Sequence, residues 1–562
     1  MAGLVLLYAA LTMLFAGLGY LDRPQDRIRG HDSVYYFIYL PSLLLDHDLK
    51  LDNNLAAIYG HVPDIGRTEK GLAVNKFPVG PALLWSPFYL SAHVLSKTLG
   101  RPADGCTGLY SLFVYLANSL YGLLGVLLTY FWLSALASRR AAFAGCAAML
   151  LASQLTYYLW PMAPVSHTAS LFASALFLLC YQKRGPGLLS GLCAALLVLT
   201  RWQNGLLLAY PLLDWLWSLS SGGRNRLARL REALVFLAAF VAGLAPQLLA
   251  WRAIYGHAIL NPMDQGFFDF VHPRLFSVLF STQHGLFLWH PLLLAGLLGL
   301  LLVQRKKARI AAGLFLAFLL QWYLNASIQD WHGSWAFGSR RFVHLLPVFA
   351  LGLAALCDRW GKKSLAAVTA LLVLFGVWNQ LFLYQYQKEL IFREGPLTAD
   401  ELVLDKFRLP ALARAKTQVN RAVFAALHAN EDEFVGSANA AYEVAPYFRQ
   451  AQAAATLSCV LAKNHPHCPE AAESLYRSAS GDPGAALAYA LVLAREGKRH
   501  EAAEIVEKDV SGEWPGTARR VSSMLAGGRV LVNEEDTAAM ASRLLSFMTR
   551  DLPWEELTQP GR

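Results

Sequence analysis

Residues 108–137, GLYSLFVYLANSLYGLLGVLLTYFWLSALA, form a run of thirty residues without a charged side chain. About 20 apolar residues in a helix span the hydrocarbon core of a bilayer, so this run predicts a transmembrane helix. The pair Arg139-Arg140 follows almost directly. Because cytoplasmic connections are enriched in Lys and Arg, the pair predicts that this helix ends on the cytoplasmic side.

Comparable runs predict eleven transmembrane helices. They lie at about 3–21, 108–137, 141–160, 163–182, 187–200, 204–220, 233–253, 285–303, 310–326, 342–357 and 364–384. Basic residues fall on every second connection: Arg139-Arg140, Lys183-Arg184, Arg224/Arg226/Arg229/Arg231, Arg305-Lys306-Lys307/Arg309 and Arg359/Lys362/Lys363. This alternation predicts a cytoplasmic N-terminus, a first extracytoplasmic loop over 22–107 and an extracytoplasmic tail. If segment 82–98 were a twelfth span, every later connection would change sides of the membrane. Its Trp85, Pro87 and Tyr89 favour instead a helix that lies on the membrane surface.

Composition supports a membrane protein. Of the 562 residues, 55% are hydrophobic and 16% charged, and the mean hydropathy is +0.36, which excludes an ordinary soluble enzyme and a disordered chain. The net charge of +10 is unevenly distributed: residues 1–384 carry 29 Lys and Arg against 15 Asp and Glu, and residues 385–562 carry 20 against 24. The basic excess therefore belongs to the membrane part, and no nucleic-acid partner is expected.

Cysteine usage does not indicate a disulfide scaffold. Five of the seven cysteines lie in or beside apolar segments and are expected to be buried: Cys106, Cys146, Cys180, Cys193 and Cys357. Cys459 and Cys468 lie in the polar tail, and whether they pair stays open at this point.

Signatures of several enzyme classes are missing. The sequence contains no Walker A loop, no GxGxxG, no HExxH, no GxSxG elbow and no CxxC. ATP-driven transport and dinucleotide chemistry therefore have no support.

The first loop places a carboxylate and a lysine beside predicted surface helices. Asp32 lies at the start of one helix, and Lys76 precedes the helix over 82–98. A lysine beside a helix start favours a bound phosphate, and a carboxylate beside it favours a base acting on a hydroxyl. Two alternatives stay open: Asp32 as a helix N-cap and Lys76 as a snorkelling surface lysine.

These residues resemble the GT-C class of membrane glycosyltransferases, which includes protein O-mannosyltransferases and lipid A aminoarabinose transferases. The resemblance rests on Asp32 followed by Tyr35-Tyr36, and on Lys76-Phe77-Pro78 before Pro81. Further matching passages are Pro164-Val165-Ser166-His167, Thr200-Arg201-Trp202, Phe280 to Phe287, and Trp331-His332-Gly333-Ser334-Trp335 to Arg340-Arg341. The resemblance covers about residues 1–384.

The resemblance implies a sugar donor linked to polyprenyl phosphate, entered from the outer leaflet, and inverting transfer with Asp32 as the catalytic acidic residue. Lys76 would match the lysine that holds the lipid phosphate. Ser33 stands where the family often has a second acidic residue, so Asp22 or Asp26 would have to supply one. No cofactor is certain, and a divalent metal ion stays open.

Other polar residues are expected on the same outer face. Arg201, Arg340 and Arg341 are candidates for the donor phosphate; the alternative for Arg201 is snorkelling to the interface. Candidates for substrate binding, besides Asp22, Asp26, Tyr35 and Tyr36, are His167, His284, Trp331, His332 and Trp335. The histidines could equally be hydrogen-bonded core residues, and the tryptophans could be interface anchors.

The tail, residues 385–562, changes to Ala-rich, charged sequence of helical period. The stretch 484–508 predicts two helices joined by a turn at Glu496-Gly497-Lys498, similar to one tetratricopeptide-type hairpin. Three clean repeats are not evident, so the tail is expected to be a helical bundle or a docking surface for an acceptor or partner.

Together these patterns predict an all-α polytopic membrane protein with a soluble helical C-terminal domain. The expected function is transfer of a sugar from a polyprenyl-phosphate donor to a hydroxyl of a glycan, lipid or protein, at a bacterial inner or plasma membrane. The alternatives are a polytopic transporter or flippase for a lipid or solute, and a non-catalytic membrane scaffold for the tail. The sequence shows no internal repeat of the kind that transporters often carry.

Overall fold

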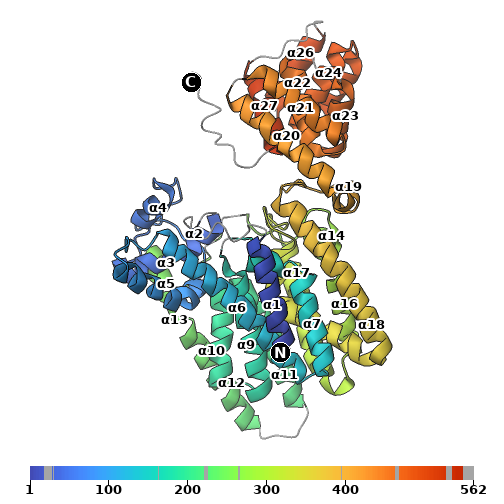
Figure 1. Ribbon diagram of the computed structural model, residues 1–562. Coiled ribbons are helices and arrows are strands. Elements are labelled where there is room, and N and C mark those ends of the chain that lie inside the picture. The colour runs from blue at the N-terminus through green and yellow to red at the C-terminus, as the bar shows by residue number, and fades with distance from the viewer. Residues whose placement is uncertain are drawn as a thin grey trace. The chain divides into compact units, whose positions relative to one another are not determined.

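The structure, a computed structural model, describes residues 1–17, 28, 31–162, 164–220, 226–261, 263, 266–393, 395–428, 430–462, 467–526 and 534–548. Within these residues the fold is all-helical, as predicted, and contains no strand beyond two isolated antiparallel bridges. The chain divides into two compact units, Met1–Gln380 and Leu381–Arg562 (Figure 1). Each unit is described by itself below.

Unit 1 contains helices of very different length. Its longer helices are α1 (Ala2–Gly17), α5 (Gly80–Thr98), α6 (Gly108–Ser134), α7 (Arg139–Leu151), α9 (Ser166–Arg184), α10 (Leu188–Thr200), α11 (Ala209–Ser220), α12 (Arg226–Gly243), α13 (Ala245–Tyr255), α17 (Ala308–Ala326) and α18 (Leu346–Gln387, which ends in unit 2). Its shorter ones are α2 (His31–Phe37), α3 (Tyr39–Pro41), η1 (Ser42–Asp46), α4 (Asp52–Tyr59), α8 (Leu155–Leu159), η2 (Trp202–Leu208), α14 (Leu275–Phe280), α15 (Leu286–Trp289), α16 (Pro291–Gly299), η3 (Leu300–Leu302), η4 (Arg305–Lys307) and η5 (Arg340–Leu345).

Among the described residues, five helical stretches are long and apolar enough to cross a membrane. They are Gly108–Ser134, Arg226–Tyr255, Ala308–Ala326, Arg340–Arg359 and Ala366–Gln387. Several other predicted spans are short or broken: the span expected at 285–303 is divided at Pro291, which has no backbone N–H to continue a helix. A membrane protein is therefore supported, and the count of eleven spans stays a prediction.

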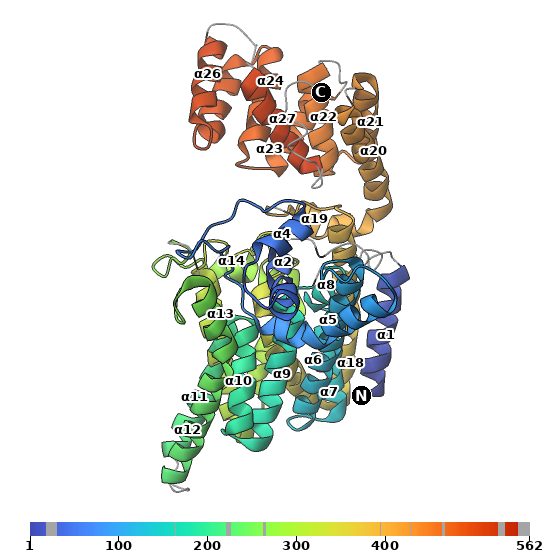
Figure 2. The same ribbon diagram turned by 90° about the vertical axis from the view of Figure 1, so that its left-hand side faces the viewer.

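Helices α6, α9, α10 and α12 pack side by side in unit 1 (Figures 1 and 2). Small residues permit this close approach, as is usual between membrane helices. At Gly125 of α6, an added Cβ would lie 2.9 Å from Cγ of Leu171 in α9. At Gly191 of α10, it would collide with the backbone oxygen of Phe236 in α12.

Helix α18 reverses direction along α7. Ala350 lies against the middle of α7, and Asp358 accepts a hydrogen bond of 2.8 Å from the backbone N–H of Ser138 at its start. Asn379 donates one of 2.9 Å to the backbone oxygen of Leu151 at its end. The chain therefore runs toward the start of α7 and then back along it, which a straight helix of 42 residues, about 63 Å long, could not do.

The basic connections of unit 1 gather at one end. Lys307 Nζ donates a hydrogen bond of 2.7 Å to the backbone oxygen of Leu136, and the guanidinium of Arg309 lies 4.9 Å from the ring centroid of Trp217. Helix α9 ends there at Arg184. This end of unit 1 is called the basic end below, and the candidate site lies at the opposite ends of α7, α9 and α17.

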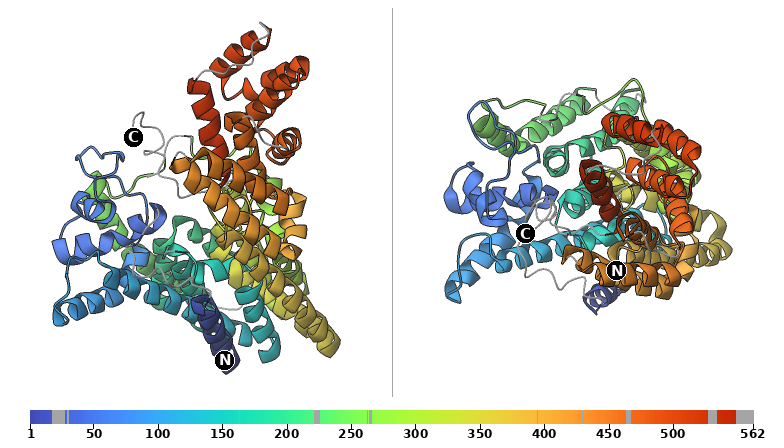
Figure 3. Two further views of the ribbon diagram at one scale, coloured as in Figure 1. Left: turned by 45° about the horizontal axis from the view of Figure 1, so that its top comes forward. Right: turned by 90° about the horizontal axis from the view of Figure 1, so that it is seen from above.

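Unit 2 is built from successive antiparallel helix pairs, which can be followed in Figure 3. The pairs are α20 (Leu409–Leu427) with α21 (Glu431–Val444), α22 (Arg449–Ala462) with α23 (Cys468–Ser478), and α24 (Pro483–Arg495) with α25 (Arg499–Ile505). The other elements are α19 (Ala399–Leu402), η6 (Leu404–Phe407), η7 (Val506–Val510), α26 (Pro515–Ala526) and α27 (Glu534–Met548). Gly497 has the left-handed φ of +87° in the predicted turn between α24 and α25.

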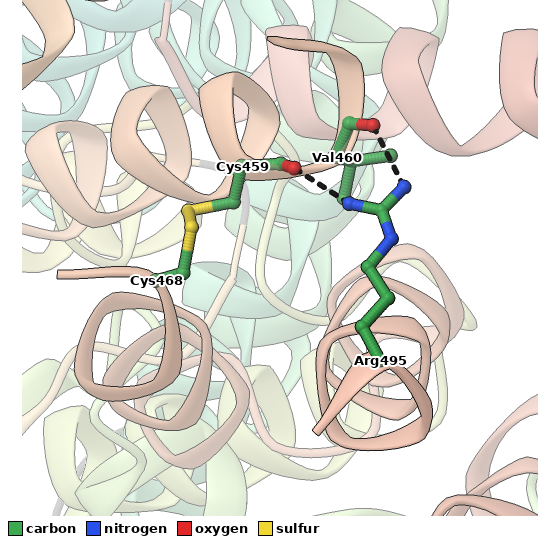
Figure 4. The surroundings of a disulfide bond; sticks show 4 residues. All are labelled: Cys459, Val460, Cys468 and Arg495. Atoms are coloured by element: carbon green, nitrogen blue, oxygen red, sulfur yellow. Dashed lines mark hydrogen bonds between the residues drawn. A yellow bond between two sulfur atoms is a disulfide. The ribbon is translucent and has the colours of Figure 1, made fainter. Parts of the chain in front are cut away.

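Cys459 and Cys468 form a disulfide between α22 and α23, which answers the question that the sequence left open (Figure 4). Their Cα atoms lie 5.5 Å apart. Beside the bond, Arg495 of α24 donates hydrogen bonds to the backbone oxygens of Cys459, at 2.7 Å, and Val460, at 3.1 Å (Figure 4). The disulfide therefore joins the two helices of the second pair, and Arg495 joins this pair to the third.

Candidate functional site

An ion pair joins the first loop to the connection before α18. Asp32 lies in the first turn of α2, and its carboxylate accepts a hydrogen bond of 2.8 Å from Nη1 of Arg340 in η5. The two side chains are only 29% and 15% exposed. A charge-assisted contact between half-buried groups fixes both of them, so Asp32 is oriented by an arginine and is not merely a surface residue.

Arg201 lies beside the start of α9, and the groups that hydrogen-bond to its guanidinium are neutral. It occupies the extended position between α10 and η2, and its Nη1 lies 3.2 Å from Nδ1 of His167 and 3.5 Å from Oγ of Ser166. It forms no ion pair with any carboxylate among the described residues. A half-buried guanidinium that bonds to no carboxylate among the described residues favours a bound anion as a further partner.

Arg341 is neutralised within the protein. It donates to both the backbone oxygen and the carboxylate of Asp330, the latter at 3.1 Å, and only 9% of its side chain is exposed. Its own backbone oxygen accepts a hydrogen bond of 2.9 Å from Gln203 of η2. Arg341 therefore holds the connection 327–339 in place, and of the two adjacent arginines it is the less suited to bind a substrate phosphate.

Lys76 lies in a segment attached to α2. Asn75 donates a hydrogen bond of 2.9 Å to the backbone oxygen of Tyr35, and the ring of Phe77 packs on Tyr35 and Tyr36 at centroid distances of 5.7 and 4.9 Å. Lys76 between them is half-buried and forms no hydrogen bond or ion pair with the described part of the chain. The backbone that carries Lys76 is therefore fixed about one helical turn from Asp32.

Two histidines shape the connection opposite α2. Nδ1 of His284 donates a hydrogen bond of 2.9 Å to the backbone oxygen of His332, and burial lowers the pKa of His284 to about 4. Nδ1 of His332 accepts one of 3.1 Å from the backbone N–H of Ser334, and burial lowers the pKa of His332 as well. Both rings are therefore neutral at physiological pH, and they act as structural hydrogen-bonding groups.

The two tryptophans of this connection differ in exposure. The ring of Trp331 is perpendicular to that of His332, at a centroid distance of 5.5 Å, whereas Trp335 is 39% exposed. An exposed indole next to the ion pairs is suited to stack on a sugar face or to lie at a membrane surface.

Two members of the site could not be predicted from the sequence patterns. The hydroxyl of Tyr158 accepts a hydrogen bond of 3.3 Å from the backbone N–H of Phe337, and its ring lies 4.3 Å from that of His167. The other is Asp330, the counter-charge of Arg341. Asp330 carried a signal, because it is the only carboxylate in the connection 327–341, but Tyr158 looked like an ordinary apolar-segment tyrosine.

Asp22 and Asp26 lie outside the described residues. In the described part of the chain, no group of three or more His, Cys, Asp or Glu side chains has the proximity of a metal site.

The site thus combines a carboxylate held by Arg340, an arginine that forms no ion pair with the described residues and a nearby lysine. Such a set can accept a proton and stabilise an anionic leaving group. Comparison with protein-family models, curated proteins and solved structures found no match.

Proposed function

We propose that the chain is an integral-membrane glycosyltransferase. It moves a sugar from a polyprenyl-phosphate donor to a hydroxyl of an acceptor glycan, lipid or protein, with inversion, on the extracytoplasmic face. The observation that carries the proposal is Arg201, a half-buried cation with neutral partners near an oriented carboxylate, Asp32.

The donor phosphate is assigned to Arg201 and Lys76. Both are cations without a described counter-charge, and the backbone beside Lys76 is held on the helix that carries Asp32. Negative charge grows on the phosphate as the glycosidic bond breaks, so cations placed beforehand stabilise the transition state more than the ground state.

Asp32 is assigned as the general base. The acceptor oxygen attacks the anomeric carbon, the bond from that carbon to the phosphate oxygen breaks, and the hydroxyl proton passes to Asp32. Polyprenyl phosphate leaves with the electron pair. Arg340 positions the carboxylate through the hydrogen bond of 2.8 Å from its Nη1.

We assign the basic end of unit 1 to the cytoplasm and the site to the outside. The positive-inside rule supports this, and a disulfide in unit 2 is consistent with an extracytoplasmic tail. The eleven-span, multi-pass inner-membrane topology is part of the proposal. A topology reporter fused after Lys363 should report cytoplasm and one at Val403 the outside; a cytoplasmic signal at Val403 would refute the assignment.

The proposal is tested by transfer from a synthetic polyprenyl-phosphate sugar in membranes that contain the full chain. Asp32→Asn removes the base and keeps the size of the side chain. Transfer should fall by about 10²–10⁴-fold, the usual contribution of a general base, while donor binding is retained. Asp269→Asn, at an exposed carboxylate of the 254–284 connection, is the matched control.

Two outcomes of this assay count against the proposal. Unchanged transfer in Asp32→Asn would remove Asp32 from the mechanism. Donor binding with no transfer by the parent protein would favour the transporter or scaffold alternatives.

A further inference from the structure

A cavity opens at the basic end of unit 1, far from the candidate site. It lies between α7 and the returning half of α18 and has a volume of about 380 Å³. Its lining residues are Arg139, Arg140, Phe143, Ala144, Thr369 and Leu372.

The polar side of this cavity is cationic. Arg139 and Arg140 are exposed and form no ion pair with the residues that the structure describes. The carboxylate at this end, Asp358, is engaged by Ser138, whose backbone N–H and Oγ lie 2.8 and 2.6 Å from it. Both arginines also lie in the first turn of α7, where the helix dipole adds positive potential. The polar side therefore suits a phosphate.

The rest of the cavity is apolar. Phe143, Ala144 and Leu372 form this wall, and the ring of Phe143 also contacts Gly3 of α1, where an added Cβ would lie 3.0 Å from it. An acyl chain is apolar along its whole length and can pack on such a wall, whereas a free phosphate or a nucleotide would place polar groups against it. The two arginines suit an anionic head group, and the apolar wall beside them suits an acyl chain. One amphipathic molecule carries both.

We propose that this cavity binds an anionic phospholipid. Its phosphate lies between Arg139 and Arg140, and one acyl chain lies along Phe143 and Leu372. The site is separate from the proposed transfer reaction and does not depend on it.

The proposal is tested by native mass spectrometry of the full chain in a neutral detergent. Dioleoylphosphatidylglycerol and dioleoylphosphatidylcholine are the two probes, since they share their chains and differ in net charge. The parent should bind the anionic lipid about tenfold tighter or more. Arg139→Gln with Arg140→Gln should abolish this preference, and Arg226→Gln with Arg231→Gln, two exposed arginines of α12, should retain it.

A cavity-filling variant separates the chain from the head group. Thr369→Trp keeps every charge and occupies the space for the acyl chain, so affinity for the anionic lipid should fall by about tenfold. If both double variants lose the preference for the anionic lipid equally, bulk electrostatics explains the preference and the proposed site is refuted. Full competition by inorganic phosphate, or unchanged lipid binding in a folded Thr369→Trp, would overturn the role of the apolar wall and with it the proposal.

Discussion

The two ends of unit 1 use the same residue type in opposite ways. At the site, Arg340 and Arg341 are 15% and 9% exposed, and each faces a carboxylate. At the basic end, Arg184, Arg226 and Arg231 are exposed and form no ion pair with the described residues. Removing a guanidinium from water costs several kcal/mol, so arginines are buried only where partners compensate. The comparison separates arginines that set topology from arginines that form a site.

Arg201 differs from the other buried arginines, and this difference points to a ligand. It is half-buried like the site arginines, yet its described partners, His167 and Ser166, are neutral. Since no carboxylate among the described residues bonds to Arg201, a ligand anion is the partner that we expect to compensate its charge.

The largest effect on donor binding is expected at Arg201. Arg201→Met keeps an apolar stem and removes the charge, so affinity for the polyprenyl-phosphate donor should fall by about 10–100-fold. Arg184→Met, an exposed arginine at the other end of the neighbouring helix α9, is the control and should bind normally. Binding is measured by titration of the purified protein. Equal affinities of the two variants would contradict the division between the two ends.

The site end should also be sensitive to acid. Burial lowers the pKa of His284 from about 6.5 in the unfolded chain to about 4, so the unfolded state binds more protons between these values. Stability contributed by neutral His284 is complete above pH 6.5 and is lost as the pH falls, by about 2 kcal/mol at pH 5. Thermal unfolding of His284→Gln should show a smaller loss between pH 7 and pH 5. An unchanged loss would place the acid sensitivity elsewhere.

Lys76 should contribute less than Arg201, because a flexible ammonium forms a less directed contact than a guanidinium. Lys76→Met should weaken donor binding by about tenfold and leave the unfolding temperature unchanged. Lys76→Arg should restore part of the binding. Donor affinity equal to that of the parent in Lys76→Met would make Lys76 a snorkelling lysine.

Arg341 should affect stability more than binding. Arg341→Met leaves Asp330 without its counter-charge, and because 37% of the Asp330 side chain is exposed, the loss should be about 1 kcal/mol. Adding Asp330→Asn should recover part of it in thermal unfolding. A double variant that loses the full sum of two single losses would show that the pair is not coupled.

The smallest effect is expected at the basic end. Arg226→Gln with Arg231→Gln removes two exposed charges without a described partner, so the free energy of unfolding should change by less than about 0.5 kcal/mol per residue. Chemical unfolding in detergent measures it. A loss comparable to that of Arg341→Met would contradict the contrast between the ends.

Local patterns explain what could be predicted from the sequence. Apolar runs and alternating basic connections depend on neighbouring residues, so the sequence alone predicted the helices. It also predicted that the basic connections lie together, and in the structure Lys307 contacts Leu136 and Asp358 contacts Ser138 at one end of unit 1. The 484–508 hairpin was equally local.

Contacts between residues far apart in the sequence could not be predicted. Asp32 and Arg340 are 308 positions apart, and no local pattern links them. The sequence grouped Arg340 and Arg341 as equal phosphate candidates, whereas Asp330 neutralises one of them. Which arginine lacks a counter-charge depends on tertiary contacts, and this distinction now directs the phosphate assignment to Arg201.

The central claim is that the site holds a polyprenyl phosphate. The most direct measurement is lipid extraction of the purified full chain, followed by mass spectrometry, with Arg201→Met purified in parallel. We expect a polyprenyl phosphate, or its sugar-linked form, to co-purify with the parent protein. With Arg201→Met, the amount of this lipid should be lower by about tenfold or more. No polyprenyl phosphate with the parent, or equal amounts with both proteins, would contradict it.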